Sequence, residues 1–323
     1  MRKMKKIGVL TSGGDAPGMN AAVRAVVRAG CEKGMEVIGI KRGYQGLING
    51  DMELMDLRSV SDIINRGGTI LYSARCLEFK EQAGIQKGID SCREHEIEGI
   101  VVIGGDGSFR GARDLSLGGI PCVGIPGTID NDIACCDYTI GYDTCLNTIM
   151  EMVDRVRDTT ESHDRCSVIE VMGRRAGYLA LNAGIAVGAT AILLPEFDYD
   201  IEKDVIERMR RTQKTGKRHF IVIVAEGVGG TEELARKIEK ELGVESRAVI
   251  LGHVQRGGTP TCRDRVVASQ MGYRAVQLLE KGIGNRVVAM QHEQILDFDI
   301  YEALSMTKSI DKELYDMALE ISI

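Results

Sequence analysis

The stretch GIPGTIDNDI, residues 124–133, places several side chains that can do chemistry directly after a short apolar run. It offers a hydroxyl on Thr128, carboxylates on Asp130 and Asp132, and an amide on Asn131. Such a group can form a turn, bind a metal ion or carry a proton. If the segment is extended, the alternation of side chains puts Thr128, Asp130 and Asp132 on the same side.

A first glycine-rich loop, TSGGDAPGMN at residues 11–20, has the composition of an anion site. Gly13, Gly14 and Gly18 allow a sharp turn and a close backbone approach just before an expected helix. The free amides at the start of that helix favour an anion. The Lys-Ser/Thr pair of a standard P-loop is missing, so that motif is not expected, and a tight turn without a ligand stays open.

A second glycine-rich loop, GGDGSFRGA at residues 104–112, surrounds Asp106 and Ser108 with four glycines. A plain turn needs only one or two glycines, because each one costs backbone entropy on folding. Phosphate bound on the backbone amides, with Mg²⁺ on the Asp106 carboxylate, would explain both features. A plain helix cap at Asp106 or Ser108 is the alternative.

A third loop, GHVQRGGTP at residues 252–260, carries His253 and Arg256, and further arginines lie nearby at 247, 263 and 265. A phosphate site and a solvated surface are equally compatible with this pattern. Together the loops favour a kinase that uses ATP and Mg²⁺. The competing class is a nucleotide-binding regulatory protein or a dehydrogenase, but a dehydrogenase would need a clean GxGxxG near the start.

Short apolar runs alternate with helical patterns almost throughout the chain, which predicts parallel sheets covered by helices on both faces. The expected strands are 6–11, 36–41, 99–104, 120–126, 165–172, 191–195, 219–227, 247–252 and 286–291. The expected helices are 18–33, 78–95, 141–160, 200–213, 231–242 and 262–281. Ligands bind beyond the carboxyl ends of such strands, which is where the polar loops lie.

Composition narrows the class of protein further. The 323 residues carry a net charge of −6, so an affinity for nucleic acid is not expected, and anionic substrates would need locally gathered arginines. There is no apolar run of 18 residues and no apolar signal core, so neither a membrane span nor a signal peptide is expected. Nine scattered cysteines without a CxxC pair indicate reduced thiols and a cytoplasmic location.

Six motifs in order and near end to end resemble the bacterial 6-phosphofructokinases: TSGGDAPGMNAAVR, GGDGS, PGTIDND, VMGR, AEG and LGHVQRGGTP. The resemblance implies phosphorylation of the 1-hydroxyl of fructose 6-phosphate by ATP. It also implies two three-layer α/β domains with mostly parallel sheets and the active site in the cleft between them. Residues 1–141 with 255–305 would bind ATP, and 142–254 with 306–323 would bind fructose 6-phosphate.

The resemblance also assigns roles to single residues. Asp130 is the expected base, Thr128 contacts the sugar end and Arg174 stabilises the transferring phosphoryl group. The expected ATP contacts, with Mg²⁺ on Asp106, are Gly14, Arg75, Cys76, Gly105, Asp106, Gly107 and Ser108. The expected sugar-phosphate contacts are Thr128, Ile129, Asp130, Arg165, Met172, Gly173, Arg174, Glu226, Arg247, His253, Val254, Gln255 and Arg256. Of these, Arg165 and Arg247 would reach in from a neighbouring subunit of a homotetramer. Only one of the two aspartates can be the base, so Asp132 is expected to hold a neighbouring arginine or a magnesium water.

Two further expectations concern the donor and the regulation. Pyrophosphate-dependent relatives carry an aspartate and a lysine where this chain has Gly107 and Gly127, so the resemblance implies ATP as the donor. A site for a nucleotide diphosphate or phosphoenolpyruvate effector is matched by Arg24, Arg28, Arg157, Lys217, Arg218 and His219. Leu57, Thr190 and Thr215 depart from the family pattern there, which implies a weakened or altered response to ADP.

Overall fold

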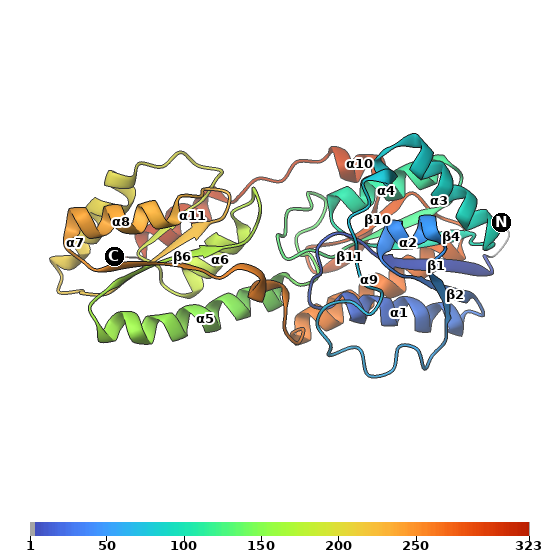
Figure 1. Cartoon of the computed structure of the whole chain (residues 1–323), viewed down its shortest axis with the longest axis horizontal. Coiled ribbons are helices and arrows are strands. Elements are labelled where there is room, and N and C mark those ends of the chain that lie inside the picture. The colour runs from blue at the N-terminus through green and yellow to red at the C-terminus, as the bar shows by residue number, and fades with distance from the viewer. Residues whose placement is uncertain (1–3, 323) are drawn as a thin grey trace. The chain divides into compact units, whose positions relative to one another are not determined.

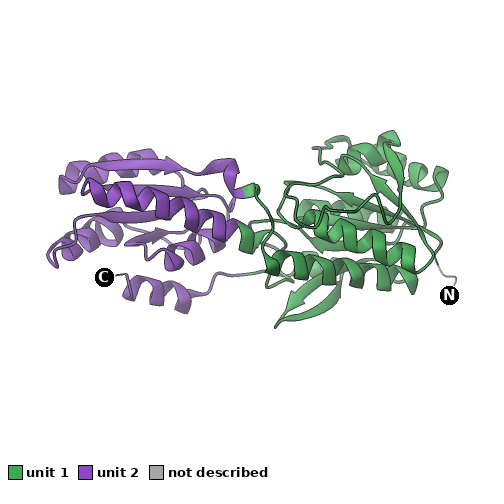
Figure 2. Cartoon of the chain, turned by 90° about the horizontal axis from the view of Figure 1, so that it is seen from below, with its two compact units in different colours: residues 1–129, 133–144, 256–308 green, residues 130–132, 145–255, 309–323 purple. Residues whose placement is uncertain are grey.

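The computed structural model describes residues 4–322, and the chain folds into two compact units (Figure 2). Unit 1 consists of residues 1–129, 133–144 and 256–308, and unit 2 of residues 130–132, 145–255 and 309–323. Apart from the segment 130–132, the chain changes unit after residues 144, 255 and 308, whereas the sequence predicted changes after 141, 254 and 305. The short segment 130–132, which carries both aspartates of the TIDND stretch, belongs to unit 2 although its neighbours on both sides belong to unit 1.

The described part of unit 1 is built on a seven-stranded sheet with the order β11-β10-β5-β4-β1-β2-β3. Its inner strands run parallel: β1 (Lys6–Thr11), β2 (Glu36–Ile40), β4 (Gly99–Gly104), β5 (Cys122–Pro126) and β10 (Arg286–Gln291). Two antiparallel strands, β3 (Met52–Met55) and β11 (Gln294–Asp299), form its edges. Every residue of β4 and β5 is buried, as strands covered on both faces should be.

Helices cover both faces of this sheet (Figure 1). On one face α1 (Met19–Glu32) packs along α9 (Cys262–Glu280), and on the other α3 (Gln82–Glu94) packs beside α4 (Asp106–Leu117). The remaining helices of unit 1 are α2 (Gly43–Asn49), the short 3₁₀ helix η1 (Glu78–Lys80) and α10 (Ile300–Ser305). Helix α5 (Tyr142–Ser162) begins in unit 1 and continues in unit 2.

Unit 2 has a parallel four-stranded sheet with the order β7-β8-β6-β9 within the described residues. The strands are β6 (Cys166–Val171), β7 (Ala191–Leu193), β8 (Phe220–Ala225) and β9 (Ser246–Ile250). The helices are α6 (Tyr178–Ala186), a π-helical turn η2 (Glu202–Ile206), α7 (Glu207–Gln213), α8 (Thr231–Leu242), the 3₁₀ helix η3 (Gly252–Arg256) and α11 (Lys312–Glu320). Its core joins inward residues of β6 and β8 to apolar residues of η2, α7 and α8.

The nine strands predicted from apolar runs are all present, which confirms the α/β class with mostly parallel sheets. The two strands that the prediction missed, MELM and QILDFD, are the antiparallel edges. Edge strands with one solvated face lack the continuous apolar run that marks a buried parallel strand.

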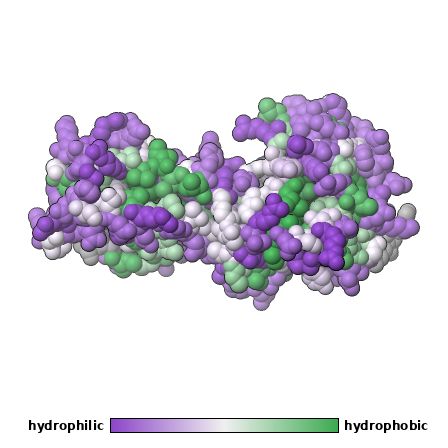
Figure 3. Space-filling view, turned by 60° about the horizontal axis from the view of Figure 1, so that its bottom comes forward, coloured by the Kyte–Doolittle hydropathy of each residue, from purple (hydrophilic) through white to green (hydrophobic). Residues whose placement is uncertain are grey.

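The hydropathy of the surface, the length of the helices and the state of the cysteines also bear on the sequence-based expectations. Most of the face seen in Figure 3 is hydrophilic, with smaller apolar areas between the charged residues. No helix among residues 4–322 is long and apolar enough to cross a membrane. The nine cysteines are thiols rather than disulfides, as their scattered spacing predicted.

Candidate active site

The segment after β5 turns sharply instead of continuing as a strand. Gly127 donates its N–H to Gly104 O (2.9 Å) and forms a single parallel bridge with Ile140. The carbonyl of Thr128 accepts a hydrogen bond from the Thr139 hydroxyl (2.6 Å). A turn follows at residues 129–130, and Asn131 has a left-handed backbone with φ 52°. The prediction of one extended segment with Thr128, Asp130 and Asp132 on the same side is therefore wrong, because the turn redirects the two aspartates.

Asp130 pairs with Arg174 inside unit 2. The side chain of Asp130 is only 1% exposed, and its Oδ2 lies 3.4 Å from Nε of Arg174, whose side chain is 64% exposed. The backbone N–H of Arg174 donates to Oε1 of Glu226, so two expected sugar contacts hold each other. A buried carboxylate facing a cation that reaches toward solvent is an arrangement that can take a proton and also attract an anionic group.

The backbone that presents Arg174 requires unusual conformations. Gly173 has φ 139°, and a Cβ there would lie 2.4 Å from Ala176 O, so a larger residue does not fit. Arg174 itself has φ 56°, a left-handed conformation that is uncommon for a residue with a side chain. Strained conformations of this kind concentrate at functional sites, where the surrounding structure holds them in place.

Met172 and Gln255 connect the loop after β6 to η3. Met172 N donates to Oε1 of Gln255 (3.0 Å), and Nε2 of Gln255 donates to Gly252 O (3.0 Å). Gln255 is fully buried, whereas the neighbouring His253 and Val254 are exposed. Gln255 thus shapes the loop, and His253 and Val254 remain available to a ligand.

The other residues of the TIDND stretch face different surroundings. Ile129 is fully buried, so a ligand could contact only its backbone. Asp132 lies near Tyr178, where burial first, and then the charges of Glu196 and Asp132, raise the tyrosine pKa to about 12. An arginine or a magnesium water as the partner of Asp132 stays a prediction.

In unit 1 the glycine loops after β1 and β4 lie side by side because these strands are neighbours in the sheet. Ser12 N donates to Ile103 O (2.9 Å), and a Cβ on Gly13 would lie 3.7 Å from the Ser108 hydroxyl. The Ser73 hydroxyl donates to Gly13 O, which brings the segment carrying Arg75 and Cys76 to the same edge. The expected ATP contacts are thus collected at the carboxyl edge of one sheet.

Asp106 starts helix α4 and forms an ion pair with Arg110, whose Nε lies 3.0 Å from Oδ2. The carboxylate is half exposed and lies where helix amides favour an anionic ligand. Within residues 4–322 no three His, Cys, Asp or Glu side chains cluster as metal ligands. Arg110 was missed in the sequence, although its position four residues after Asp106 on a helix is a signal that could have found it.

The glycines of the site differ in the space around them. A Cβ on Gly105 or Gly107 would meet no atom within 4 Å. On Gly127 it would lie 3.1 Å from Cγ2 of Ile103 and 3.2 Å from Cε of Met19. Gly107 therefore leaves open space beside the loop, whereas a side chain at Gly127 would be in tight contact with Ile103 and Met19.

Tyr44 and Phe79 pack against the second glycine loop, and neither was predicted from the sequence. Their rings stack with centroids 4.2 Å apart, and the Tyr44 hydroxyl donates to Ser108 O (2.5 Å). Burial raises the pKa of Tyr44 well above its usual value, so the hydroxyl stays protonated as a donor. Gly111 makes room for the ring, since a Cβ there would lie 2.6 Å from it.

Three arginines expected around the sugar phosphate, Arg256, Arg165 and Arg247, are placed by different elements of the two units. Nη1 of Arg256 donates to Asp15 O (3.2 Å), so this side chain lies against the first glycine loop in unit 1. Arg165 directly precedes β6, and Arg247 lies near the start of β9. Met172 follows the other end of β6, and a six-residue strand separates it from Arg165 by about 20 Å. Arg165 and Arg247 therefore lie at the amino edge of their sheet, opposite the expected sugar contacts.

The expected effector residues divide between the units. Arg24 and Arg28 lie on α1, where burial and then the charge of Arg28 lower the pKa of Arg24. In unit 2, Nζ of Lys217 lies 3.4 Å from the Thr190 hydroxyl, and burial together with the charge of Arg157 lowers the lysine pKa.

The other three effector candidates, Arg157, Arg218 and His219, also belong to unit 2. Arg218 faces Asp164 at 3.6 Å, and His219 is partly exposed. Arg157 itself donates to Val187 O.

Comparison with known proteins gives a family consistent with this geometry. Residues 6–279 match the family model described as phosphofructokinase. The chain is 55% identical over 320 residues to the ATP-dependent 6-phosphofructokinase of Bacillus cytotoxicus, covering 99% of this chain and all of that one. The chain therefore belongs to the phosphofructokinase family.

Solved structures of yeast proteins share the fold. Phosphofructokinase from Saccharomyces cerevisiae superposes with a TM-score of 0.88 at 35% identity, and that from Pichia pastoris in the T-state with 0.89 at 36% identity. Each match covers 99% of this chain. The chain spans 48% and 38% of those longer yeast chains.

Proposed function

We propose that the protein transfers the γ-phosphoryl group of ATP to the 1-hydroxyl of fructose 6-phosphate, giving fructose 1,6-bisphosphate and ADP in the committed step of glycolysis. The observation that carries the proposal is the pairing of buried Asp130 with exposed Arg174 at 3.4 Å. The activity named for the Bacillus relative, which matches over its whole length, supports the same reaction.

Asp130 acts as the general base that takes the proton of the attacking sugar hydroxyl. Arg174 neutralises negative charge on the phosphoryl group in flight, and its long exposed side chain can do so while its backbone stays fixed by Glu226. Thr128 contributes its hydroxyl to the sugar substrate, while its own backbone carbonyl accepts a hydrogen bond from the Thr139 hydroxyl. Phosphoryl transfer depends mainly on such positioning and charge neutralisation.

The nucleotide is held by Gly14, Arg75, Cys76, Gly105, Gly107 and Ser108, on the loops collected at the carboxyl edge of the unit 1 sheet. Asp106 is the residue that would hold Mg²⁺, because this ion uses one or two protein carboxylates and completes its shell with waters and substrate phosphates. Bound Mg²⁺ neutralises charge on the phosphates. Arg110 would then exchange its partner Asp106 for a phosphate oxygen or for solvent.

The sugar phosphate is held in unit 2 by Met172, Gly173, Arg174, Glu226 and the exposed His253 and Val254, with Gln255 fixing their loop. Arg165 and Arg247 lie at the opposite edge of the unit 2 sheet, so they reach a sugar phosphate on a second copy of the chain. A shared site of this kind requires a homo-oligomer, for which a homotetramer is the expected form.

The effector residues would bind a nucleotide diphosphate or phosphoenolpyruvate, with a weak response to ADP. Thr190 supports this proposal, since a hydroxyl there offers Lys217 no negative charge. The nine thiols fit a reducing cytoplasmic environment.

A coupled assay that compares ATP with pyrophosphate, and fructose 6-phosphate with other sugar phosphates, tests the reaction. Turnover with ATP and fructose 6-phosphate at least a hundredfold above every other pair, on the order expected for specific phosphoryl transfer, supports the proposal. Binding of ATP without any transfer to a sugar phosphate would refute it and favour a nucleotide-binding regulatory role.

A further inference from the structure

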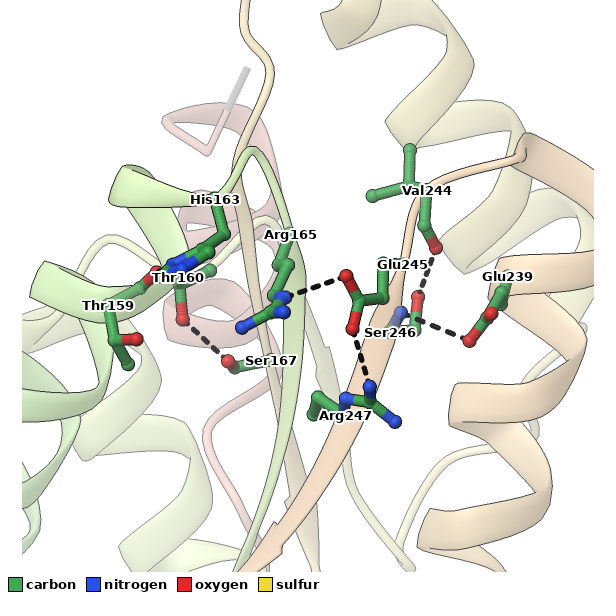
Figure 4. Close-up of polar contacts among 10 residues, drawn as sticks. All are labelled: Thr159, Thr160, His163, Arg165, Ser167, Glu239, Val244, Glu245, Ser246 and Arg247. Atoms are coloured by element: carbon green, nitrogen blue, oxygen red, sulfur yellow. Dashed lines mark hydrogen bonds and ion pairs between the residues drawn. The ribbon is translucent and has the colours of Figure 1, made fainter.

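Glu245 lies between Arg165 and Arg247 at the amino edge of the unit 2 sheet (Figure 4). Its Oε2 lies 2.9 Å from Nε of Arg165, and Nη2 of Arg247 donates to its Oε1. The residue directly precedes β9, and strand pairing of Cys166 with Ser246 brings the starts of β6 and β9 together. Each oxygen of one carboxylate thus engages a different arginine.

These contacts engage both arginines, but they leave Nε of Arg165 without a well-aligned hydrogen bond and most of Arg247 exposed. Nε of Arg165 is buried and makes no hydrogen bond, although Oε2 lies 2.9 Å away, so the pair attracts through charge with poor alignment. The Arg247 side chain remains 65% exposed. The guanidinium of Arg165, followed by that of Arg247, lowers the pKa of Glu245, which keeps the carboxylate ionised at neutral pH. Two positive charges against one leave the cluster with a net charge of +1.

We propose that Glu245 is an internal counterion that occupies Arg165 and Arg247 until a phosphate monoester displaces it, and that it thereby weakens the binding of the sugar phosphate. This rests on the proposed role of the two arginines in holding the 6-phosphate. A phosphate dianion carries more charge than a carboxylate and offers three oxygens to the planar guanidinium groups, so it can replace Glu245. Glu245 keeps the arginines ordered in the free enzyme and competes with the ligand for them.

The test is the Glu245→Gln variant of the full chain, assayed for the KM of fructose 6-phosphate at saturating ATP. Glutamine keeps the shape and removes the charge, so we expect the KM to fall about two- to tenfold, as for the loss of partly exposed ion pairs, while kcat changes less. Inorganic phosphate, used as a competing anion, should inhibit this variant at correspondingly lower concentration.

Glu239→Gln is the matched control. Glu239 also lies beside the start of β9, where its Oε2 accepts from Ser246 N (3.3 Å), but it contacts neither arginine. The control should leave the KM within about twofold of wild type, since it changes net charge alone. If Glu245→Gln does not fold, Glu245→Ala supplies the same charge removal.

Arginine variants separate this inference from the proposed function. Arg247→Ala should raise the KM, and in that background Glu245→Gln should lower it less than in the wild type. If Arg247→Ala raises the KM while Glu245→Gln also raises it or leaves it unchanged, the counterion role is refuted and the phosphate role stands. If Arg165→Ala and Arg247→Ala both leave the KM unchanged, the phosphate role is refuted, and the counterion role with it.

Discussion

The expected ligand contacts of unit 1 share one edge of its sheet, whereas those of unit 2 lie at both edges. In unit 1 the loops after β1 and β4 touch through Ser12 and Ile103, and Ser73 joins the segment of Arg75 to them. In unit 2 Met172 and Glu226 follow the carboxyl ends of β6 and β8, while Arg165 and Arg247 lie at the amino ends of β6 and β9.

The parallel-sheet rule explains the site of unit 1 but not the arginines of unit 2. Loops after neighbouring parallel strands meet whatever their sequence, so polar residues placed there form a site within one chain. Residues before such strands point to the other edge and can serve the same ligand only through another molecule. The first arrangement follows from topology alone, and the second requires assembly.

The largest expected effect tests the carboxyl-edge site of unit 2. Asp130→Ser should lower kcat by about 10²–10⁴-fold or more while the KM for fructose 6-phosphate is largely kept, because a general base is lost but the sugar contacts remain. Steady-state kinetics with both substrates measure this. Asp132→Asn is the control, since Asp132 lies in the same stretch and its charge acts on Tyr178, and it should cost roughly less than tenfold. Turnover like wild type in Asp130→Ser would refute the base assignment.

A smaller effect tests the nucleotide loops of unit 1. Gly107→Asp adds a side chain where no atom lies within 4 Å, so the fold should persist. Its charge, at about 6 Å from a phosphate and an effective dielectric constant of about 20, costs about 3 kcal/mol, or about a hundredfold in kcat/KM for ATP. Gly105→Ala, equally open, is the uncharged control. Unchanged ATP use in Gly107→Asp would contradict the explanation of donor choice by this open space.

The sequence predicted the sheets and the loops that position the site because buried parallel strands leave continuous apolar runs and glycine clusters mark the turns after them. It missed β3 and β11, whose antiparallel edge positions leave no such run. It also placed Thr128, Asp130 and Asp132 on one side, because the left-handed turn at Asn131 has no signal stronger than the residue type itself.

Residues that contact the site but lie far from it in the sequence were the least predictable part of the site. Tyr44 stacks on Phe79 and holds Ser108, yet Tyr44 and Phe79 are far from Ser108 in the sequence and lie in none of the six motifs. Glu245 is one charged residue among many in the sequence, and only the pairing of β6 with β9 brings it between two arginines. Contacts of this kind follow from tertiary packing, which local pattern does not encode.

A few-fold effect tests the departure at Thr190 in unit 2. We expect little activation of the wild type by ADP at subsaturating fructose 6-phosphate. Thr190→Glu should place a carboxylate beside Nζ of Lys217, raise the lysine pKa that burial and Arg157 lower, and increase the response to ADP. The measurement is initial rate against ADP concentration.

Two results would decide that prediction. Strong ADP activation of the wild type would contradict it, because the chain would then need no carboxylate at this position. Thr190→Val is the control for the lost hydroxyl, and it should not increase the response. The Thr190 side chain is buried, so the stability of both variants should be measured alongside.

The smallest expected effect on catalysis concerns the ion pairs that join β11 to α9 and β10 in unit 1. Asp297 on β11 accepts from Arg274 on α9 (2.6 Å) and from Arg286 on β10 (2.8 Å), and its side chain is 12% exposed. Asp297→Asn leaves both arginines with a weaker partner and should cost about 1–3 kcal/mol of stability at neutral pH. Neither KM should change, because none of these residues belongs to the expected contacts.

The pH dependence of this loss has a defined sign. Burial alone would raise the pKa of Asp297, but the hydrogen bonds from Arg274 and Arg286 outweigh it and lower that pKa below 3.8. A carboxylate with a lowered folded-state pKa stabilises fully above its unfolded pKa and loses this contribution as the pH falls through the folded value. The difference in Tm between wild type and Asp297→Asn should therefore be constant from pH 7 to about 5 and shrink below about 4. A difference that grew on acidification would contradict the lowered pKa of Asp297. A raised KM in a variant with unchanged Tm would mean that this edge of the sheet contributes to ligand binding.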